Sequence, residues 1–228
     1  MQNILKIGHR GAKGYQPENT LVSFQKALDL NVDGVEFDVH VCKSGELIVI
    51  HDFTVDRTTN GTGAVAELTL SELKALRIND NSQIPTLEEV TPLFNKNHLI
   101  NIELKGLDTA KKVCDFIEKL IQQGAFCYSN FIVSSFDKAE LKTVADYQPQ
   151  IPIGILKHEN LAEALEWAEQ FSAVAIIPHF SLLTKENVAL MRQKGYSIYT
   201  WTVNEPADIV RVKALSVDAI ITDFPDRI

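Results

Sequence analysis

The chain has 228 residues, of which 45% are hydrophobic and 23% are charged, and this ordinary globular composition at this length suits one large domain. The formal net charge of −8 excludes a sequence-independent attraction to nucleic acid or to anionic membranes, so an anionic substrate needs a local positive site. No apolar run approaches the roughly 18 residues of a membrane span, and we expect neither a membrane span nor a signal peptide.

Eight short runs rich in β-branched and other apolar residues predict eight strands. Most of these runs lack strict alternation of apolar and polar residues, which is typical of strands that are covered on both faces. The runs occupy residues 3–9, 34–41, 98–105, 131–136, 151–157, 173–180, 196–203 and 218–224.

Helical patterns separate these strands. Residues 20–30 have the apolar spacing of a helix, and Asp108 is placed to cap a helix over 109–123 that Gly124 ends,. Further helices are expected where a capping residue or a proline precedes an amphipathic segment. These helices would begin after Asp137 and after Asn160, cover 184–194, and begin at Pro206.

Strands that alternate with helices over this length predict an α/β fold, a TIM (β/α)8 barrel that forms a single domain over 1–228. A doubly wound open sheet is the alternative, and the absence of a G-x-G-x-x-G motif after a strand weakens its nucleotide-binding form. One connection, 42–98, is too long for a simple crossover helix. We expect it to be a small insertion after the second strand, with a returning strand, a polar loop and short helices.

Two carboxylates share one face of the second predicted strand. Glu36 and Asp38 are two residues apart, about 7 Å along a strand, and they face the barrel axis if the apolar residues around them face the helices,. Glu103 lies on the next strand, which is a neighbour in a barrel. Three carboxylates without a nearby cysteine suit a hard cation, Mg²⁺ or Ca²⁺. A salt-bridge network with Lys105 and Arg10 is the structural alternative.

Two histidines lie at the ends of predicted strands. His9 ends the first strand and His51 ends the returning strand. Because histidine titrates near neutrality, two histidines beside a metal-bound phosphate would suit acid-base cleavage of a P–O bond. A hydrogen-bonded structural role is the alternative for each, and it is our interpretation of the other four histidines: His40, His98, His158 and His179.

Positive charge and aromatic rings accompany these residues. Arg10 and Lys105 would bind a phosphate, since arginine donates two parallel hydrogen bonds and lysine acts as a point charge. Neutralisation of the carboxylates is the alternative, and the two roles are compatible. Trp201 at the end of the seventh strand, with Phe180, would form a wall of the pocket unless both are ordinary core aromatics.

The three cysteines, Cys42, Cys114 and Cys127, are odd in number and share no metal-type spacing. We therefore expect free thiols in a reducing compartment and a cytoplasmic location.

Five sequence blocks resemble the glycerophosphodiester phosphodiesterase family. They are "HRGAKGYQPENT", "GVEFDVHVCKSGELIVIHD", "DRTTNGTG", "NIELK" and "YTWTVN", and "DAIITDFPD" is similar to the closing strand of that family. The resemblance covers about residues 7–225. It implies a TIM barrel with a small insertion after the second strand, and hydrolysis of glycerophosphodiesters to sn-glycerol 3-phosphate and an alcohol with a divalent cation.

The resemblance also implies a role for each candidate residue. The metal ligands would be Glu36, Asp38 and Glu103, the acid-base pair His9 and His51, the phosphate contacts Arg10 and Lys105, and further site-lining residues Glu18 and Trp201. The glycerol hydroxyl of the substrate would attack phosphorus first, and water would then open the resulting cyclic phosphate.

Two other functions fit the same sequence. A lysophospholipase D acting on lysolipids would need an apolar trough, which the mostly polar insertion disfavours. A non-catalytic phosphodiester-binding protein is disfavoured by the complete set of polar residues. The sequence leaves open the head-group alcohol of the small-molecule substrate, the choice of Mg²⁺ or Ca²⁺, which histidine is the base, and the oligomeric state.

Overall fold

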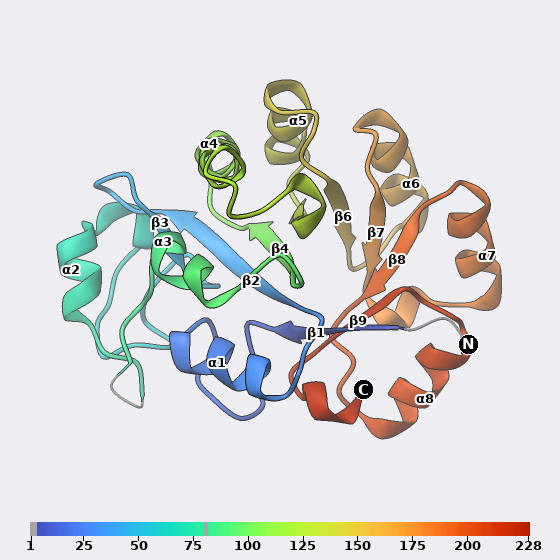
Figure 1. The fold of residues 1–228 in the computed structure, drawn as a ribbon, viewed down its shortest axis with the longest axis horizontal. Coiled ribbons are helices and arrows are strands. Elements are labelled where there is room, and N and C mark those ends of the chain that lie inside the picture. Colours follow the sequence, from blue (N-terminus) through green and yellow to red (C-terminus); the bar gives the residue numbers. More distant parts are fainter. Residues whose placement is uncertain (1–3, 80–81) are drawn as a thin grey trace.

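Eight parallel strands close into a barrel in the computed structural model, which describes residues 4–79 and 82–228 (Figure 1). The barrel strands are β1 (Leu5–His9), β2 (Gly34–Val41), β4 (Leu99–Leu104), β5 (Phe131–Ser135), β6 (Ile153–Lys157), β7 (Ala175–Pro178), β8 (Ser197–Thr200) and β9 (Ala219–Thr222). Because β1 pairs with both β2 and β9, the sheet has no open edge there. The predicted TIM barrel is confirmed and the open-sheet alternative is excluded.

The predicted strands are present, and most are somewhat shorter at their ends than the apolar runs suggested. The run 3–9 corresponds to β1, and its first residue, Asn3, lies outside the described residues. The helices around the barrel are α1 (Leu21–Asp29), α4 (Ala110–Gln122), α5 (Lys138–Tyr147), α6 (Leu161–Gln170), α7 (Lys185–Gln193) and α8 (Pro206–Ala214). Short 3₁₀ turns lie at η3 (Tyr128–Asn130), η4 (Phe180–Leu182) and η5 (Pro225–Arg227).

The predicted cap of α4 is wrong. Asp108 has a left-handed backbone, φ 57°, and Thr109 is the N-cap residue, without a side-chain hydrogen bond to the helix. The carboxylate of Glu140, from α5, instead accepts hydrogen bonds from the backbone N–H groups of Asp108 and Ala110 at 2.8 and 2.7 Å. A side chain of the neighbouring helix α5 therefore caps α4, and no local sequence pattern predicts this contact.

The packing of β2 decides where its carboxylates point. Phe37 is fully buried, and its ring lies 5.4 Å from that of Phe24 on α1 in an edge contact. The apolar side chains of β2 therefore face the helices, and the alternate residues face the barrel interior. That interior holds a second, smaller apolar cluster, which includes Ile7, Ile132 and Tyr199.

The segment between β2 and β4 forms a small extension that packs against the barrel, and part of it has an apolar cluster separate from the main core. Its elements are β3 (Leu47–Val49), η1 (Val65–Glu67), α2 (Leu70–Ala75), α3 (Leu87–Val90) and η2 (Thr91–Leu93). β3 returns antiparallel along the carboxyl end of β2, and Cys42, Ile48 and Leu73 belong to a separate apolar cluster. Residues 80–81 of the predicted insertion 42–98 lie outside the described residues, and its status as an insertion within one domain, 1–228, stays a prediction.

Candidate active site

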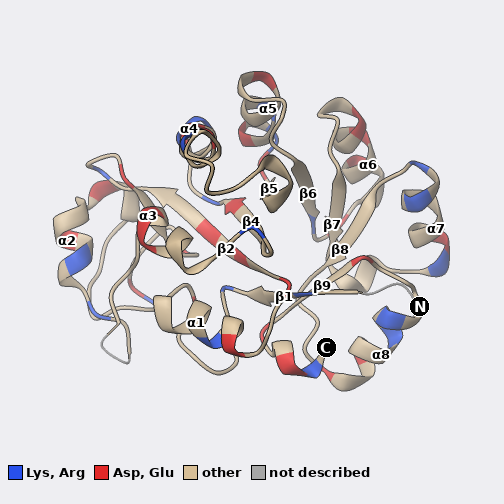
Figure 2. Cartoon of the chain, in the orientation of Figure 1, with Lys and Arg blue, Asp and Glu red and all other residues tan. Residues whose placement is uncertain are grey.

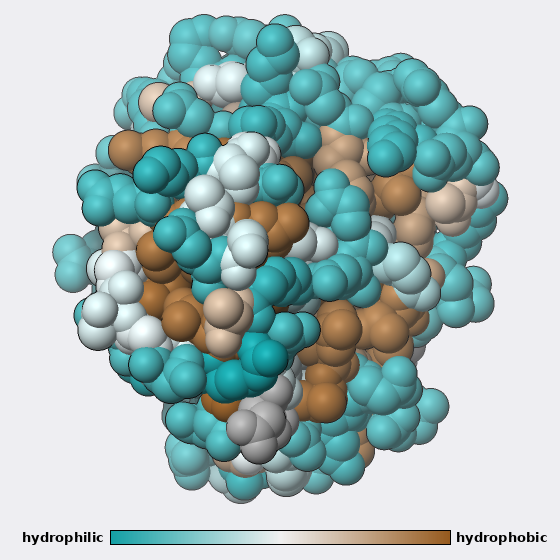
Figure 3. Space-filling model, turned by 90° about the vertical axis from the view of Figure 1, so that its left-hand side faces the viewer, coloured by the Kyte–Doolittle hydropathy of each residue, from teal (hydrophilic) through white to brown (hydrophobic). Residues whose placement is uncertain are grey.

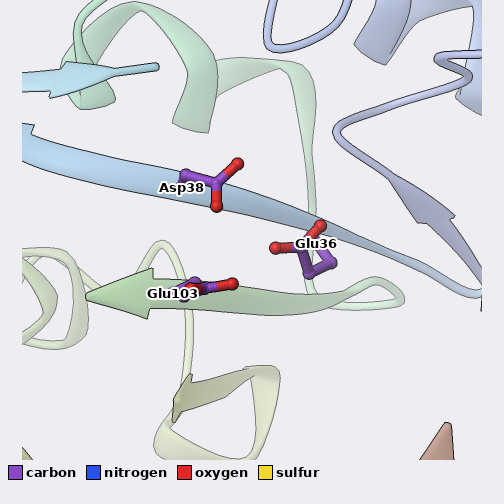
Figure 4. A group of neighbouring side chains, drawn as sticks. All are labelled: Glu36, Asp38 and Glu103. Carbon is purple, nitrogen blue, oxygen red and sulfur yellow. The ribbon is translucent and has the colours of Figure 1, made fainter. Parts of the chain in front are cut away.

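Three carboxylates meet at the carboxyl end of β2 and β4. Glu36, Asp38 and Glu103 are buried, and one oxygen of each lies within 4.8 Å of the others. The strand register pairs Asp38 with Glu103 directly. Figure 4 shows the three side chains turned toward one another, and Figure 2 shows acidic stretches on β2 and β4. The period-two geometry of the strands, with barrel closure, brings them together.

This carboxylate cluster strongly disfavours its own full ionisation. Burial and then the charges of Asp38 and Glu103 raise the pKa of Glu36 well above its usual value. Burial and then Asp38 raise the pKa of Glu103 to about 7, although the Lys105 ammonium donates a hydrogen bond to Glu103 Oε1 at 2.9 Å. The nearby protein cations therefore do not balance the negative charge, and a further cation would.

One oxygen of the carboxylate cluster supports metal binding directly. Asp38 Oδ1 is buried and has no hydrogen-bond partner among the described residues. The other oxygen, Oδ2, accepts from Asn19 Nδ2 at 2.9 Å and lies 3.4 Å from Arg10 Nε. A buried carboxylate oxygen without a partner is costly. An all-oxygen donor set with one such atom fits a hard cation such as Mg²⁺ or Ca²⁺.

His9 is held beside the carboxylate cluster by an aspartate from the other end of the chain. Its Nδ1 lies 2.6 Å from Asp223 Oδ1, and its Nε2 lies 3.9 Å from Glu36 Oε2. Burial raises the pKa of Asp223, but the hydrogen bond with His9 and the neighbouring positive charges outweigh it and lower the pKa overall, so the ionised carboxylate accepts a hydrogen bond from the Nδ1–H group of His9. Burial lowers the pKa of His9 despite Asp223. The neutral ring then presents Nε2 as a proton acceptor.

His51 has the same kind of partner. Its Nδ1 lies 2.6 Å from Asp52 Oδ1, and Arg57 Nε donates to Asp52 Oδ2 at 2.6 Å. Burial is the largest cause of the lowered pKa of His51. Both histidines are therefore oriented by a carboxylate through Nδ1, which leaves Nε2 for proton transfer.

Glu18 lies in the site, but its oxygens are already engaged. Arg10 Nη1 donates to Oε1 at 2.8 Å, and Arg57 donates to Oε1 and Oε2 at 2.7 and 3.1 Å. Burial raises the pKa of Glu18, but the two guanidinium groups outweigh it and lower the pKa to about 2. Glu18 therefore joins the loop after β1 to the insertion and holds Arg10 beside Asp38.

Lys105 and Trp201 both lie near the ring of Phe136. The Lys105 ammonium is 5.5 Å from the centroid of the Phe136 ring, and the Trp201 ring meets the same ring edge-on at 5.5 Å. The Trp201 indole N–H donates to the Ile177 carbonyl at 2.9 Å. Lys105 thus joins the carboxylate cluster, whereas Trp201 belongs to an aromatic side of the barrel mouth.

Sequence reasoning missed the residues that orient the candidate groups. Asp223 holds His9 and is itself held by Asn204, whose side-chain N–H donates to Asp223 Oδ2 at 2.8 Å. Asn19 holds Asp38, and Arg57 holds Asp52. One signal was present for Asp223: it directly follows the last barrel strand, which closure places next to the first.

Comparisons with known proteins agree with this architecture. The model of the glycerophosphoryl diester phosphodiesterase family matches residues 9–227. A glycerophosphodiester phosphodiesterase of Caldanaerobacter subterraneus is 37% identical, over 98% of this chain and 96% of that protein. One from Bacillus subtilis is 34% identical, over 98% of this chain and 84% of that protein.

Solved structures show the same fold. An Oleispira antarctica phosphodiesterase in complex with the product sn-glycerol-3-phosphate superposes with a TM-score of 0.88 at 26% identity, over 97% of this chain and 93% of that chain. A glycerophosphodiester phosphodiesterase from Thermotoga maritima gives 0.81 at 28% identity, over 99% and 97%. Over residues 4–79 and 82–228, no helix combines the length and apolar character needed to span a membrane.

Proposed function

Because the chain belongs to the glycerophosphoryl diester phosphodiesterase family, we propose that it uses a divalent cation to hydrolyse glycerophosphodiesters to sn-glycerol 3-phosphate and an alcohol. The observation that carries this proposal is the buried carboxylate cluster together with two carboxylate-oriented histidines. The product bound to the Oleispira antarctica relative is sn-glycerol-3-phosphate, which supports the substrate class.

Glu36, Asp38 and Glu103 would hold one Mg²⁺ or Ca²⁺. When bound, the cation would neutralise phosphate charge and stabilise the charge that develops during cleavage. Arg10 and Lys105 supply further positive charge in a protein whose net charge is −8. Arg10 lies 3.4 Å from Asp38 and Lys105 lies 2.9 Å from Glu103, and these contacts with the carboxylate cluster support roles for both as phosphate contacts.

His9 and His51 would move the protons. One histidine accepts at Nε2 the proton of the attacking glycerol hydroxyl, whose oxygen bonds to phosphorus. The other donates a proton to the oxygen of the departing alcohol as its P–O bond breaks, which leaves a cyclic glycerol phosphate. Water then opens the cyclic ester with the two proton roles exchanged. Asp223 and Asp52 hold the two rings in the required tautomer.

Glu18 would act by fixing Arg10, and Trp201 would form part of the wall around the substrate. We also propose a cytoplasmic location, which the free cysteines support, including the exposed Cys127,.

The decisive assay measures glycerol 3-phosphate released from a panel of glycerophosphodiesters, with chelator and then with Mg²⁺ or Ca²⁺ restored. We expect release that chelation abolishes and that one of the two ions restores. Absence of release from every member with metal present would contradict the proposal. Tight binding without release would instead establish a non-catalytic binding protein.

A further inference from the structure

A pocket of about 270 Å³ opens beside the carboxylate cluster. Its inner lining includes Glu103 and the adjacent Lys105, and its outer lining includes Phe53, Leu107 and Phe136. These three apolar residues come from three different segments: the insertion, the loop after β4 and the loop after β5. The pocket therefore continues outward from groups that we assign to phosphate and metal binding.

The outer residues of this pocket are unusually exposed for their type. Phe53 is 57% exposed, Leu107 is 70% exposed and Phe136 is 37% exposed. Single exposed apolar side chains are common, but a group of them around one concave site indicates a binding function. Figure 3, which views the side where the insertion lies, shows apolar patches breaking an otherwise hydrophilic face.

Two of these side chains are held in place before any ligand arrives. The Phe53 ring meets the His40 ring edge-on at 5.1 Å, and the Phe136 ring meets the Trp201 ring at 5.5 Å. The rings of Phe53 and Phe136 are therefore already held in place at the outer part of the pocket, so a ligand loses less conformational entropy from these side chains when it binds.

We propose that this pocket binds an aliphatic chain carried by the phosphodiester. The inference rests on the proposed function, because it takes the phosphate to lie at Lys105 and the carboxylate cluster. The pocket is smaller than the 300–1,000 Å³ typical of whole ligands, so it accommodates one arm of the substrate. The chain has two possible sources, the departing alcohol or an acyl group on the glycerol.

The charges around the pocket disfavour a cationic head group. The Lys105 ammonium already lies near the Phe136 ring, where a quaternary ammonium would bind,. Asp137 lines the pocket, but its Oδ1 accepts from the N–H groups of Ala139 and Glu140 at the start of α5. A cation in the pocket would therefore meet the Lys105 ammonium group. Of the two carboxylates that line the pocket, Glu103 is already paired with Lys105 and Asp137 is engaged at the start of α5.

The hydrogen-bond groups disfavour a polyol. The Ser135 hydroxyl donates to the Leu104 carbonyl at 2.7 Å, so its proton is committed. The three outer side chains offer no hydrogen bonds, and a buried ligand hydroxyl without a partner is costly. A chain of methylene groups avoids this cost, and each buried methylene should strengthen binding by up to about fourfold.

The first test compares two substrate series in the presence of the activating metal. One series carries ethyl, butyl or hexyl leaving alcohols on glycerophosphate, and the other carries butanoyl or hexanoyl chains on glycerophosphocholine. We expect kcat/KM to rise about two- to fourfold per methylene in one series. The series that shows the rise identifies whether the leaving alcohol or the acyl group on the glycerol occupies the pocket. A flat dependence in both would overturn the proposal.

Variants locate the effect. L107S and F53S should each reduce the chain-length dependence of kcat/KM by at least half. Val210 on α8 is 69% exposed, so V210S is a matched control that should keep the wild-type dependence. Wild-type dependence in both pocket variants would show that the chain binds elsewhere and would refute the assignment.

A binding measurement separates this proposal from the proposed function. Calorimetric titration with hexyl phosphate and ethyl phosphate, with metal present, requires no turnover. Tighter binding of hexyl phosphate that L107S abolishes would support the pocket even if no glycerophosphodiester were hydrolysed. Equal affinity for the two esters would defeat the pocket assignment even in an active enzyme.

Discussion

His9 Nδ1 lies 2.6 Å from Asp223 Oδ1, and this contact joins the ends of the first and last barrel strands across 214 positions of sequence. It exists because β1 pairs with β9 when the barrel closes. Asn204 holds Asp223 from the other side. The orientation of a candidate catalytic ring is therefore a consequence of barrel closure.

Replacing Asp223 with Asn should lower kcat about 100-fold with little change in KM, because the His9 ring loses the acceptor that fixes its tautomer. Steady-state kinetics of glycerol 3-phosphate release measure this effect. D226N is the control, since Asp226 is exposed and its carboxylate accepts hydrogen bonds from the Tyr15 hydroxyl, away from His9. A kcat within fivefold of wild type for D223N would remove Asp223 from the mechanism.

His9→Ala and His51→Ala should each lower kcat by about 100-fold or more, because each removes one proton-transfer group. His98 precedes β4 at the opposite end of the barrel, so H98Q serves as control. Comparison of kcat for the three variants tests the assignment. Near-normal turnover by either alanine variant would exclude that histidine as acid or base.

Arg57 connects two parts of the site, since it donates to both Asp52 and Glu18. R57A should lower kcat about tenfold, because the partner of His51 and the anchor of Arg10 both lose a hydrogen-bonded cation. R57K should recover part of this loss. R211A on α8 controls for removal of an exposed arginine. Unchanged kcat in R57A would contradict a positioning role.

The ion pairs of Glu18 with Arg10 and Arg57 should make the stability of the fold depend on pH in the acid range. The pKa of Glu18 is about 2 in the folded protein, which is below its value in the unfolded chain. Ionised Glu18 therefore contributes fully to the free energy of unfolding at neutral pH, and this contribution is lost as the pH falls from the unfolded pKa toward 2. At pH 7, the free energy of unfolding of E18Q should be about 2 kcal/mol lower than that of the wild type. Urea denaturation should show this gap shrinking by about 1 kcal/mol at pH 3.5. A pH-independent gap would disprove the linkage.

Removal of divalent metal should destabilise the protein, because the carboxylate cluster then keeps its repulsion. Adding Mg²⁺ or Ca²⁺ at about 100 times the dissociation constant should raise Tm by about 5 °C. D38N should lose this rise, whereas E67Q, at an exposed carboxylate of the insertion, should retain it. Thermal unfolding of the chelated protein measures the shift. An equal rise in wild type and D38N would place the metal elsewhere.

The sequence by itself determined what depends on local periodicity. Alternation in β2 placed Glu36 and Asp38 on one face, and strand-ending residues such as His9 marked the barrel mouth, because each follows from backbone geometry over a few residues. Capping by Asp137 followed from the same local chemistry.

Only the tertiary structure decided which distant groups meet. It assigned Asp223 to His9, enclosed Glu18 between two guanidinium groups, and gave α4 a cap from Glu140. It also gathered Phe53, Leu107 and Phe136 around one pocket. Each of these contacts joins segments far apart in the chain, and barrel closure and loop packing set their distances, which no local pattern encodes.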